Sequence, residues 1–263
     1  MAEATHQFDD GAAYERFMGR WSRAAGTIFL DWVAPPEDAR WLEVGCGTGV
    51  FTELVLDRSS PATVIAIDPS AAQIELARSK QVARWADFRV ADAQALPFPD
   101  DTFDVVASAL VINFIPDPAR ALAEMRRVGR PGSVLAGYVW DFAGSRSPGS
   151  LLRRAMRRIG ADDPPVSGTE TSRLDAIRQL FAQAGLQEIA GRTIDVTVSF
   201  PDFGDFWQSQ TQRANPTSKM IAALPESDRA KLIAAVRTEL PAGPDGTFAY
   251  SARANAVKAR VPG

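Results

Sequence analysis

Two hydrophobic patterns alternate along the first half of the chain: short continuous apolar runs, and longer segments with apolar residues at helical spacing. Continuous runs are typical of strands that are buried on both faces of a sheet. They fall at about 40–45, 63–68, 88–91, 103–109 and 133–140. Helical spacing predicts helices at about 11–34, 49–56, 70–80 and 117–128. These β-α repeats with short loops predict an open, mostly parallel sheet with helices on both faces.

The pattern loosens after Trp140. Residues 143–169 are rich in Gly, Ser and Pro around one basic helix, and a further helix is predicted at 171–183. A sixth strand is predicted at 186–199, helical structure at 200–240, and a last, antiparallel strand at 247–259, where apolar and polar residues alternate. We therefore predict an α/β fold with seven strands, the last one antiparallel, and with helical insertions late in the chain.

Charge and the rare residue types exclude several function classes. A formal net charge of −3 gives no global support to nucleic-acid binding. Cys46 is the single cysteine and His6 the single histidine, so we expect no disulfide within the chain, no metal site and a cytoplasmic location. The longest apolar stretch, 103–115, is interrupted by Asp104 and Asn113 and is too short to span a membrane.

Three glycines spaced two apart follow the first predicted strand. Gly45, Gly47 and Gly49 allow a tight turn and let the backbone lie against a ligand. Asp68 ends the second strand, where its carboxylate can accept hydrogen bonds from both hydroxyls of a ribose. This arrangement predicts a nucleotide-binding unit. The spacing Gly-x-Gly-x-Gly differs from the dinucleotide pattern Gly-x-Gly-x-x-Gly, which disfavours NAD.

Several segments form a recognisable set: Glu43-Val-Gly-Cys-Gly-Thr-Gly49, Ala66-Ile-Asp-Pro-Ser70, Ala91 to Asp104, Arg130-Pro-Gly-Ser133 and, more loosely, Tyr14 to Ser22. Their order and spacing between about 40 and 140 resemble those of a known family, the class I S-adenosylmethionine-dependent methyltransferases. The similarity is to the small-molecule branch that includes ubiquinone/menaquinone-biosynthesis methyltransferases, and residues 145–263 match it only in layout. The resemblance implies a Rossmann-like sheet, and S-adenosylmethionine as a cofactor that leaves as S-adenosylhomocysteine.

The resemblance also divides the chain, which we expect to form one methyltransferase domain over 1–263. Residues 1–36 correspond to N-terminal helices that act as a lid. Residues 37–142 correspond to the cofactor-binding core. Residues 143–263 correspond to acceptor-side helices and the last two strands.

Cofactor contacts are implied for residues of the matching motifs. Gly45, Cys46 and Gly47 would line the methionine part through their backbone, and Glu43 would orient this loop or approach the amino group. A structural carboxylate at a strand end is an equally good interpretation of Glu43. Asp68 and the adjoining Pro69 would hold the ribose, although Asp68 could instead cap the following helix.

Further cofactor contacts are implied beyond these motifs. Asp92 would accept a hydrogen bond from the adenine amino group, with the Ala93 N–H meeting a ring nitrogen. Ser108 would offer its backbone carbonyl to the cofactor's amino group. On the N-terminal segment, Tyr14 would touch the methionine end and Arg20 would pair with its carboxylate. The alternative for this segment is an amphipathic helix with Arg20 in solvent.

A pocket for the methyl acceptor is expected beyond the carboxyl ends of the fourth and fifth strands. The abundance of aromatic residues in these loops and in the predicted lid favours a small acceptor that is apolar or contains an aromatic ring. Each aromatic residue alone is also compatible with a place in the core. The candidates are Asn113, Phe114, Trp140, Asp141 and Phe142, with Met18, Trp21, Phe203, Phe206 and Trp207 as a cover.

Five arginines gather around the basic helix. A solvated helix face is one interpretation, and a site for an anionic acceptor or carrier is the other. Asp162 and Asp163 follow closely and could pair with them. The arginines are Arg146, Arg153, Arg154, Arg157 and Arg158.

Methyl transfer is an in-line displacement that needs a dry pocket and a positioned nucleophile. Asp141 is a possible general base and Tyr14 a weaker one. An acceptor that is itself acidic would need neither. Two other functions are compatible with the sequence: a reaction other than methylation that uses the same cofactor, and cofactor binding without catalysis. We expect a small-molecule partner, no nucleic acid, and a monomer or homodimer.

Overall fold

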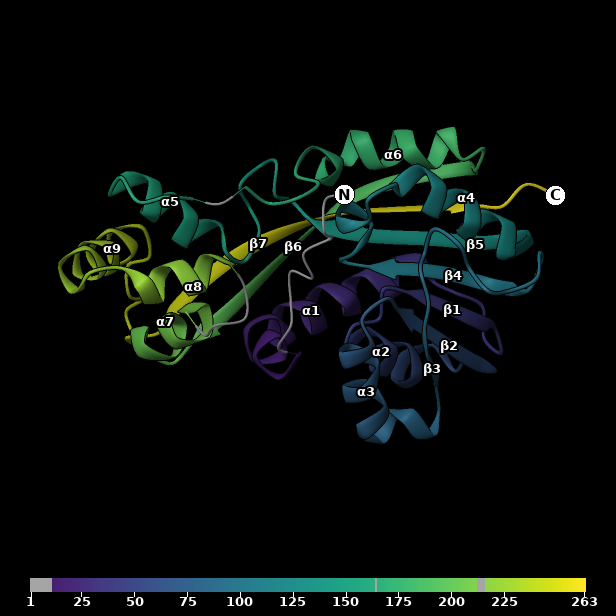
Figure 1. Ribbon diagram of the computed structural model, residues 1–263, viewed down its shortest axis with the longest axis horizontal. Coiled ribbons are helices and arrows are strands. Elements are labelled where there is room, and N and C mark those ends of the chain that lie inside the picture. Colours follow the sequence, from purple (N-terminus) through teal and green to yellow (C-terminus); the bar gives the residue numbers. More distant parts are fainter. Residues whose placement is uncertain (1–10, 164, 212–215) are drawn as a thin grey trace.

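The computed structural model describes residues 11–163, 165–211 and 216–263, which form one seven-stranded sheet flanked by helices (Figure 1). The strand order is β3-β2-β1-β4-β5-β7-β6. β7 is antiparallel to β5 and β6, and the other neighbouring strands are parallel. The predicted fold, with its antiparallel last strand, is confirmed. The strands are β1 (Arg40–Val44), β2 (Thr63–Asp68), β3 (Asp87–Val90), β4 (Phe103–Ala109), β5 (Gly129–Trp140), β6 (Gln187–Phe200) and β7 (Phe248–Arg260).

Helices cover both faces of the sheet, with α1, α2 and α3 on one face and α4 and α6 on the other (Figure 1). No helix among the described residues is long and apolar enough to cross a membrane. The α-helices are α1 (Gly11–Val33), α2 (Val50–Ser59), α3 (Ala71–Ser79), α4 (Pro118–Val128), α5 (Ser150–Arg158), α6 (Leu174–Gln183), α7 (Phe203–Thr211), α8 (Pro216–Ala223) and α9 (Glu226–Glu239). Short 3₁₀ helices are η1 (Gln81–Arg84), η2 (Ile112–Phe114) and η3 (Glu170–Ser172).

The sheet has a hydrophobic core on each face, which explains why its central strands are continuous apolar runs in the sequence. In β4, Val105 and Ala107 pack into the core beneath α1 and α2, whereas Val106 between them packs into the core beneath α4 and α6. Successive side chains of a strand point to opposite faces, so a strand with a core on each side needs apolar residues at every position.

Several boundaries differ from those predicted. β5 begins at Gly129 rather than near 133, because Gly129 already pairs with Phe103 before a register irregularity. The helical region 200–240 is divided into α7, α8 and α9, and Pro225 stands as the N-cap of α9. The 3₁₀ helices were not predicted, since three or four residues carry too little periodicity to be recognised.

The late helices α5, α7, α8 and α9 gather around the far ends of β6 and β7, away from the parallel part of the sheet (Figure 1). We call this group the distal lobe. Its α7–α9 part leaves the sheet after Phe200 and returns at Phe248, and these two residues are directly paired in the β6–β7 ladder. Phe206 of α7 packs edge-on against Phe200 at 5.2 Å between ring centroids, which fixes α7 to the sheet.

Candidate active site

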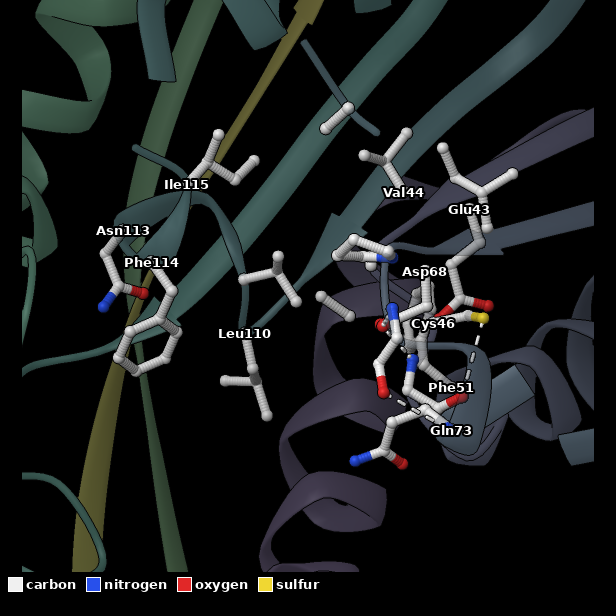
Figure 2. A pocket seen from close by; sticks show the side chains of 18 of the residues that line it. Glu43, Val44, Cys46, Phe51, Asp68, Gln73, Leu110, Asn113, Phe114 and Ile115 are labelled. Atoms are coloured by element: carbon white, nitrogen blue, oxygen red, sulfur yellow. Dashed lines mark hydrogen bonds between the residues drawn. The ribbon is translucent and has the colours of Figure 1, made fainter. Parts of the chain in front are cut away.

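A cavity of about 750 Å³ lies at the carboxyl ends of β1, β2 and β4 (Figure 2). β1 is flanked by β2 on one side and β4 on the other, so the strand order reverses there. Ligands of open α/β sheets bind at such a reversal. Of the predicted site residues, those that line the cavity are Glu43, Gly45, Cys46, Gly47, Asp68, Pro69, Asp92, Ala93, Asn113 and Phe114.

The glycine loop after β1 turns on positive φ angles. Gly45 has φ 82° and Gly47 has φ 52°, a backbone region that glycine adopts without steric cost. The N–H groups of Gly45 and Cys46 both donate to the Ile67 carbonyl, at 2.8 and 2.9 Å. A Cβ on Gly45 would lie 2.5 Å from Val111, whereas no described atom lies within 4 Å of a Cβ on Gly47. Packing against Val111 therefore requires glycine at position 45. At position 47, the space that a side chain would fill is part of the cavity.

Asp68 holds the glycine loop from the tip of β2. Its Oδ2 accepts a hydrogen bond from the Gly47 N–H, and its Oδ1 accepts one from the Ser70 N–H, each at 2.9 Å. The hydroxyl of Ser70, rather than Asp68, caps α3 by accepting from the Gln73 N–H at 3.4 Å. Each carboxylate oxygen has a second lone pair, so Asp68 can hold this loop and still accept hydrogen bonds from a ligand.

Glu43 is the most deeply buried carboxyl of the cavity lining, with 1% of its surface exposed. The Thr52 hydroxyl donates to its Oε2 at 2.5 Å. Burial, and next the negative charge of Asp68, raise the pKa of Glu43 to about 7, against the lowering effect of the Thr52 hydrogen bond. Burial likewise raises the pKa of the Cys46 thiol, helped by Glu43 and Asp68. The thiol therefore stays protonated and unreactive near neutral pH.

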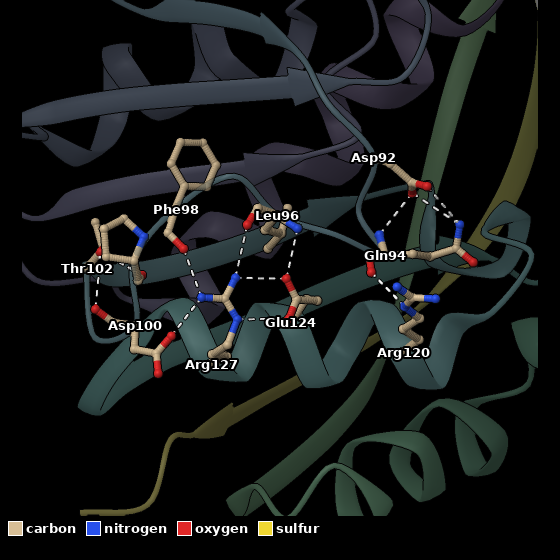
Figure 3. A network of polar contacts seen from close by, with 10 residues as sticks. Asp92, Gln94, Leu96, Phe98, Asp100, Thr102, Arg120, Glu124 and Arg127 are labelled. Atoms are coloured by element: carbon tan, nitrogen blue, oxygen red, sulfur yellow. Dashed lines mark hydrogen bonds and ion pairs between the residues drawn. The ribbon is translucent and has the colours of Figure 1, made fainter.

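The loop after β3 is fastened to α4 by a polar network (Figure 3). Asp92 Oδ1 accepts from the Gln94 N–H at 2.9 Å, and the Gln94 carbonyl accepts from the Arg120 Nε at 2.8 Å. Further along, Arg127 donates to the carbonyls of Leu96 and Phe98, at 3.0 and 2.8 Å. The loop that presents Asp92 and Ala93 to the cavity is thus positioned by α4.

That network also includes an ion pair. Glu124 lies 2.8 Å from Arg127 and accepts from the Leu96 N–H at 2.8 Å. The Arg127 hydrogen bond holds the pKa of Glu124 below its usual value.

The other end of the cavity is mainly apolar and is formed by the residues after β4. Leu110, Asn113, Phe114 and Ile115 stand across from Glu43, Cys46, Asp68 and Gln73 (Figure 2).

A second segment closes this apolar end. Ser167, Gly168 and Thr171 line it from the loop that ends in η3. Gly168 has φ 66°, and a Cβ there would lie 1.6 Å from the Asn113 carbonyl oxygen. The Asn113 Nδ2 donates to the Ser167 carbonyl at 3.4 Å. The two loops therefore form one wall, which we call the η2–η3 wall.

Several predicted site residues lie elsewhere in the structure. Arg20 is half exposed; its Nη1 lies 2.9 Å from Asp205 of α7, and it does not line the cavity. Asp141 also lies outside the lining; its Oδ1 accepts from the Gly144 N–H at 2.8 Å. Ser108 is fully buried and does not line the cavity. The Tyr14 side chain lies outside the described part of the chain.

The predicted aromatic cover is part of the core. Trp21 packs edge-on against Trp140 at 6.4 Å between ring centroids, and Phe203 stacks on Trp207 at 6.0 Å. Met18 is buried in the same core cluster. Instead, two small residues of α1, Gly19 and Ser22, line the cavity.

The structure adds lining residues that the sequence did not indicate. Gln94 follows the Asp92-Ala93 motif directly and could have been included on that ground. Val111 follows β4 and could have been found from its position. Ser167, Gly168 and Thr171 lie in a Gly/Ser/Pro-rich stretch with no motif, and only the fold brings them to the cavity.

The basic helix carries paired charges. Arg153 and Arg157 contact Asp163, and Arg154 and Arg158 contact Glu239 of α9. Four of the five arginines thus have an acidic partner, which disfavours an anion site. No ion pair is found for Arg146 among the described residues, and Arg153 is largely buried rather than solvated.

Comparison with known proteins agrees with this geometry. Residues 42–137 match the family described as "Methyltransferase domain". Over 95 residues the chain is 42% identical to the 2-methyl-6-phytyl-1,4-hydroquinone methyltransferase 2 of Oryza sativa, covering 36% of this chain and 27% of that protein. Over 146 residues it is 35% identical to the ubiquinone/menaquinone biosynthesis C-methyltransferase UbiE of Paracoccus denitrificans, covering 54% of this chain and 57% of that protein.

A solved structure shares the fold. The phosphoethanolamine N-methyltransferase 2 of Haemonchus contortus, solved with phosphomonomethylethanolamine and S-adenosylhomocysteine, superimposes with a TM-score of 0.58 at 18% identity, covering 96% of this chain and 57% of that chain.

The sheet order and the matched segment together define the class: the sheet has the class I S-adenosylmethionine-dependent methyltransferase fold, and residues 42–137 match the methyltransferase domain. Within that class it is similar to the small-molecule branch that includes UbiE and the methyl-phytyl-hydroquinone methyltransferases. The matched part spans between 27% and 59% of the length of its curated relatives.

Proposed function

We propose that the protein transfers the methyl group of S-adenosylmethionine to a small acceptor of apolar or aromatic character. The observation that carries the proposal is the division of one cavity into a polar end at the glycine loop and an apolar end at the η2–η3 wall. Such a cavity suits two ligands side by side, a polar cofactor and a less polar acceptor. Its volume of about 750 Å³ is within the range of small-molecule sites.

The proposed cofactor contacts follow the polar end. The backbone of Gly45, Cys46 and Gly47 would meet the methionine part, with Glu43 behind this loop. Asp68, with Pro69 beside it, would accept hydrogen bonds from the ribose. Asp92 and Ala93 would meet the adenine from the loop that α4 holds. Their place in the lining supports these assignments.

The cofactor supplies a methyl group on a positively charged sulfur, which a nucleophile displaces in line. The chain's part is to position the nucleophile and to keep water out. Leu110 and Val111 would exclude water, and Asn113 and Thr171 would orient the acceptor by hydrogen bonds. Asp141 lies away from the cavity, so we propose that the acceptor's own acidity, rather than this carboxylate, provides the nucleophile.

Calorimetric titration with S-adenosylmethionine, S-adenosylhomocysteine and NADH tests the cofactor assignment. We expect one-site binding of the first two compounds and none of NADH. Asp68→Asn keeps the shape but removes the charge, and we expect it to weaken cofactor binding by about 1.5–3 kcal/mol. Asp87→Asn, at an exposed position of β3, serves as the control and should leave the affinity unchanged.

Labelled-methyl transfer to a panel of phenols, quinols, enols and amines then tests the reaction. Transfer to at least one member is expected. Tight cofactor binding without transfer to any member would contradict methyl transfer. It would favour a different reaction with the same cofactor, or a non-catalytic binding role. Binding of NADH instead would overturn the cofactor assignment as well.

A further inference from the structure

We infer that the acceptor is bound as an uncharged molecule, and that a permanent carboxylate, phosphate or sulfate group on it is rejected. The inference rests on the proposed function, because it assumes that the acceptor occupies the apolar end of the cavity. The inference concerns only those groups of the acceptor that do not react. A reacting hydroxyl that loses its proton is a different case, because the positive sulfur of the cofactor balances its negative charge.

The charges of the lining carry this inference. Among the described residues that line the cavity, three are acidic (Glu43, Asp68 and Asp92) and none is Lys, Arg or His. Two of these carboxylates, Glu43 and Asp68, lie across the cavity from Leu110 and Ile115 (Figure 2). The apolar end offers Leu110 and Ile115 with uncharged polar groups such as Asn113 and Thr171, so a buried anion would find no opposite charge.

Three cations close to the cavity, all within the described part of the chain, are already engaged elsewhere. Lys80 Nζ donates to the Thr48 carbonyl at 3.0 Å, and Arg120 Nε donates to the Gln94 carbonyl at 2.8 Å. Arg20 on α1, one residue from the lining Gly19, contacts Asp205. Bringing any of these groups to an anionic acceptor would break a contact that holds the loop or the helix.

The uncharged polar groups at the apolar end suit a neutral donor on the acceptor. Asn113 is 3% exposed, and its Nδ2 is directed at the Ser167 carbonyl, which fixes the orientation of the amide. Its Oδ1 is buried and has no hydrogen-bond partner among the described residues. In Figure 2 this oxygen lies on the side of Phe114, opposite the amide nitrogen. A carbonyl oxygen attracts a hydroxyl or amine donor and repels an anion.

The test uses hydroxy-aryl and hydroxy-alkyl carboxylic acids, each beside its own methyl ester, so that each pair differs mainly in charge. Binding to the protein saturated with S-adenosylhomocysteine is measured at pH 7 by ligand-observed NMR and calorimetry. We expect the esters to bind at least about tenfold more tightly than their acids, because a buried unpaired carboxylate is strongly unfavourable. Acids that bind as tightly as their esters, or a panel in which no ester binds, would overturn the inference.

A charge added to the wall provides the second readout. Thr171→Lys places an ammonium group in the lining, and we expect it to improve acid binding at least about tenfold relative to Thr171→Met, a variant of similar length without the charge. Equal acid binding by both variants would contradict the inference. Binding of S-adenosylhomocysteine and methyl transfer are measured separately, so failure of the proposed function is visible apart from the charge preference.

Discussion

The three glycines after β1 are needed for different reasons. Gly45 lies against Val111, Gly49 has Phe88 3.0 Å from where its Cβ would stand, and Gly47 leaves open space. The sequence predicts that this turn requires glycine, because the spacing matches a nucleotide-binding turn. It does not identify Val111 or Phe88 as the neighbours. Val111 lies in the loop after β4, 66 positions from Gly45, and Phe88 lies in β3, 39 positions from Gly49.

Glu43 makes the stability of the cofactor-free protein depend on pH. Its pKa rises from 4.5 to about 7 on folding, so the folded state holds a proton that the unfolded state has lost in this range. The free energy of unfolding should therefore fall as the pH rises from about 4.5 to 7, by about 3 kcal/mol in total from this group. Urea unfolding at pH 5 and pH 8, with Glu43→Gln beside the wild type, measures the effect.

The amide side chain introduced by Glu43→Gln cannot ionise, so this variant should gain stability relative to the wild type as the pH is raised. Asp195 and Asp245 have lowered pKa values and lose their protons below this range. They therefore affect both proteins alike. Parallel pH profiles for the two proteins would show that Glu43 does not titrate as described.

At the scale of elements, regular strands and helices follow from the sequence, and the cavity wall does not. The bounds of β4 and α4 are predicted within a residue or so, because β4 is a continuous apolar run and α4 has apolar residues at helical spacing. η2 and η3 have three residues each and no period. The aromatic side chains of α1 and α7 were ambiguous for a physical reason: apolar residues at helical spacing serve equally to fill a core or to cover a ligand.

Gly168 should be indispensable for the η2–η3 wall. Its Cβ would overlap the Asn113 carbonyl, so Gly168→Ala must separate η3 from η2. We expect acceptor turnover to fall at least about tenfold and stability to fall by about 1–3 kcal/mol, with cofactor affinity changed less than about threefold, since the cofactor end is built on other loops. Steady-state kinetics and calorimetry measure these quantities.

Gly160→Ala is the matched control for this variant. Gly160 has a similar φ of 74°, but no described atom lies within 4 Å of a Cβ there. It should therefore lose stability from the backbone alone and keep acceptor turnover. Equal turnover of the two variants would mean that the wall tolerates the separation.

For the whole molecule, the sequence predicted the seven-stranded architecture and the class of cofactor, because both depend on local motifs in a fixed order. Contacts between distant parts of the chain could not be predicted from the sequence. Arg20 and Asp205 are separated by 185 positions, and nothing in either local pattern points to the other. The placement of the distal lobe at the ends of β6 and β7 was likewise not predicted.

The ion pair between Arg20 and Asp205 connects α1 to the distal lobe at the protein surface. Its side chains are 52% and 31% exposed, and such pairs contribute at most about 1 kcal/mol. We expect Arg20→Ala and Asp205→Ala to cost equally little stability and to leave cofactor affinity unchanged. A tenfold loss of affinity in Arg20→Ala, but not in Asp205→Ala, would instead assign Arg20 to the cofactor's carboxylate.

The pairing of Phe200 with Phe248 has a consequence for how this protein can diversify. The segment that contains α7, α8 and α9 starts after Phe200 and ends before Phe248, and these two residues are directly paired. The length of this segment therefore does not affect the register of β6 and β7. Insertions, deletions or whole replacements between these two residues leave every other strand pairing in place. An exchanged module must again cover Phe200 and Phe248 and pack against α5, while the strand pairings at the cofactor end of the molecule do not depend on it.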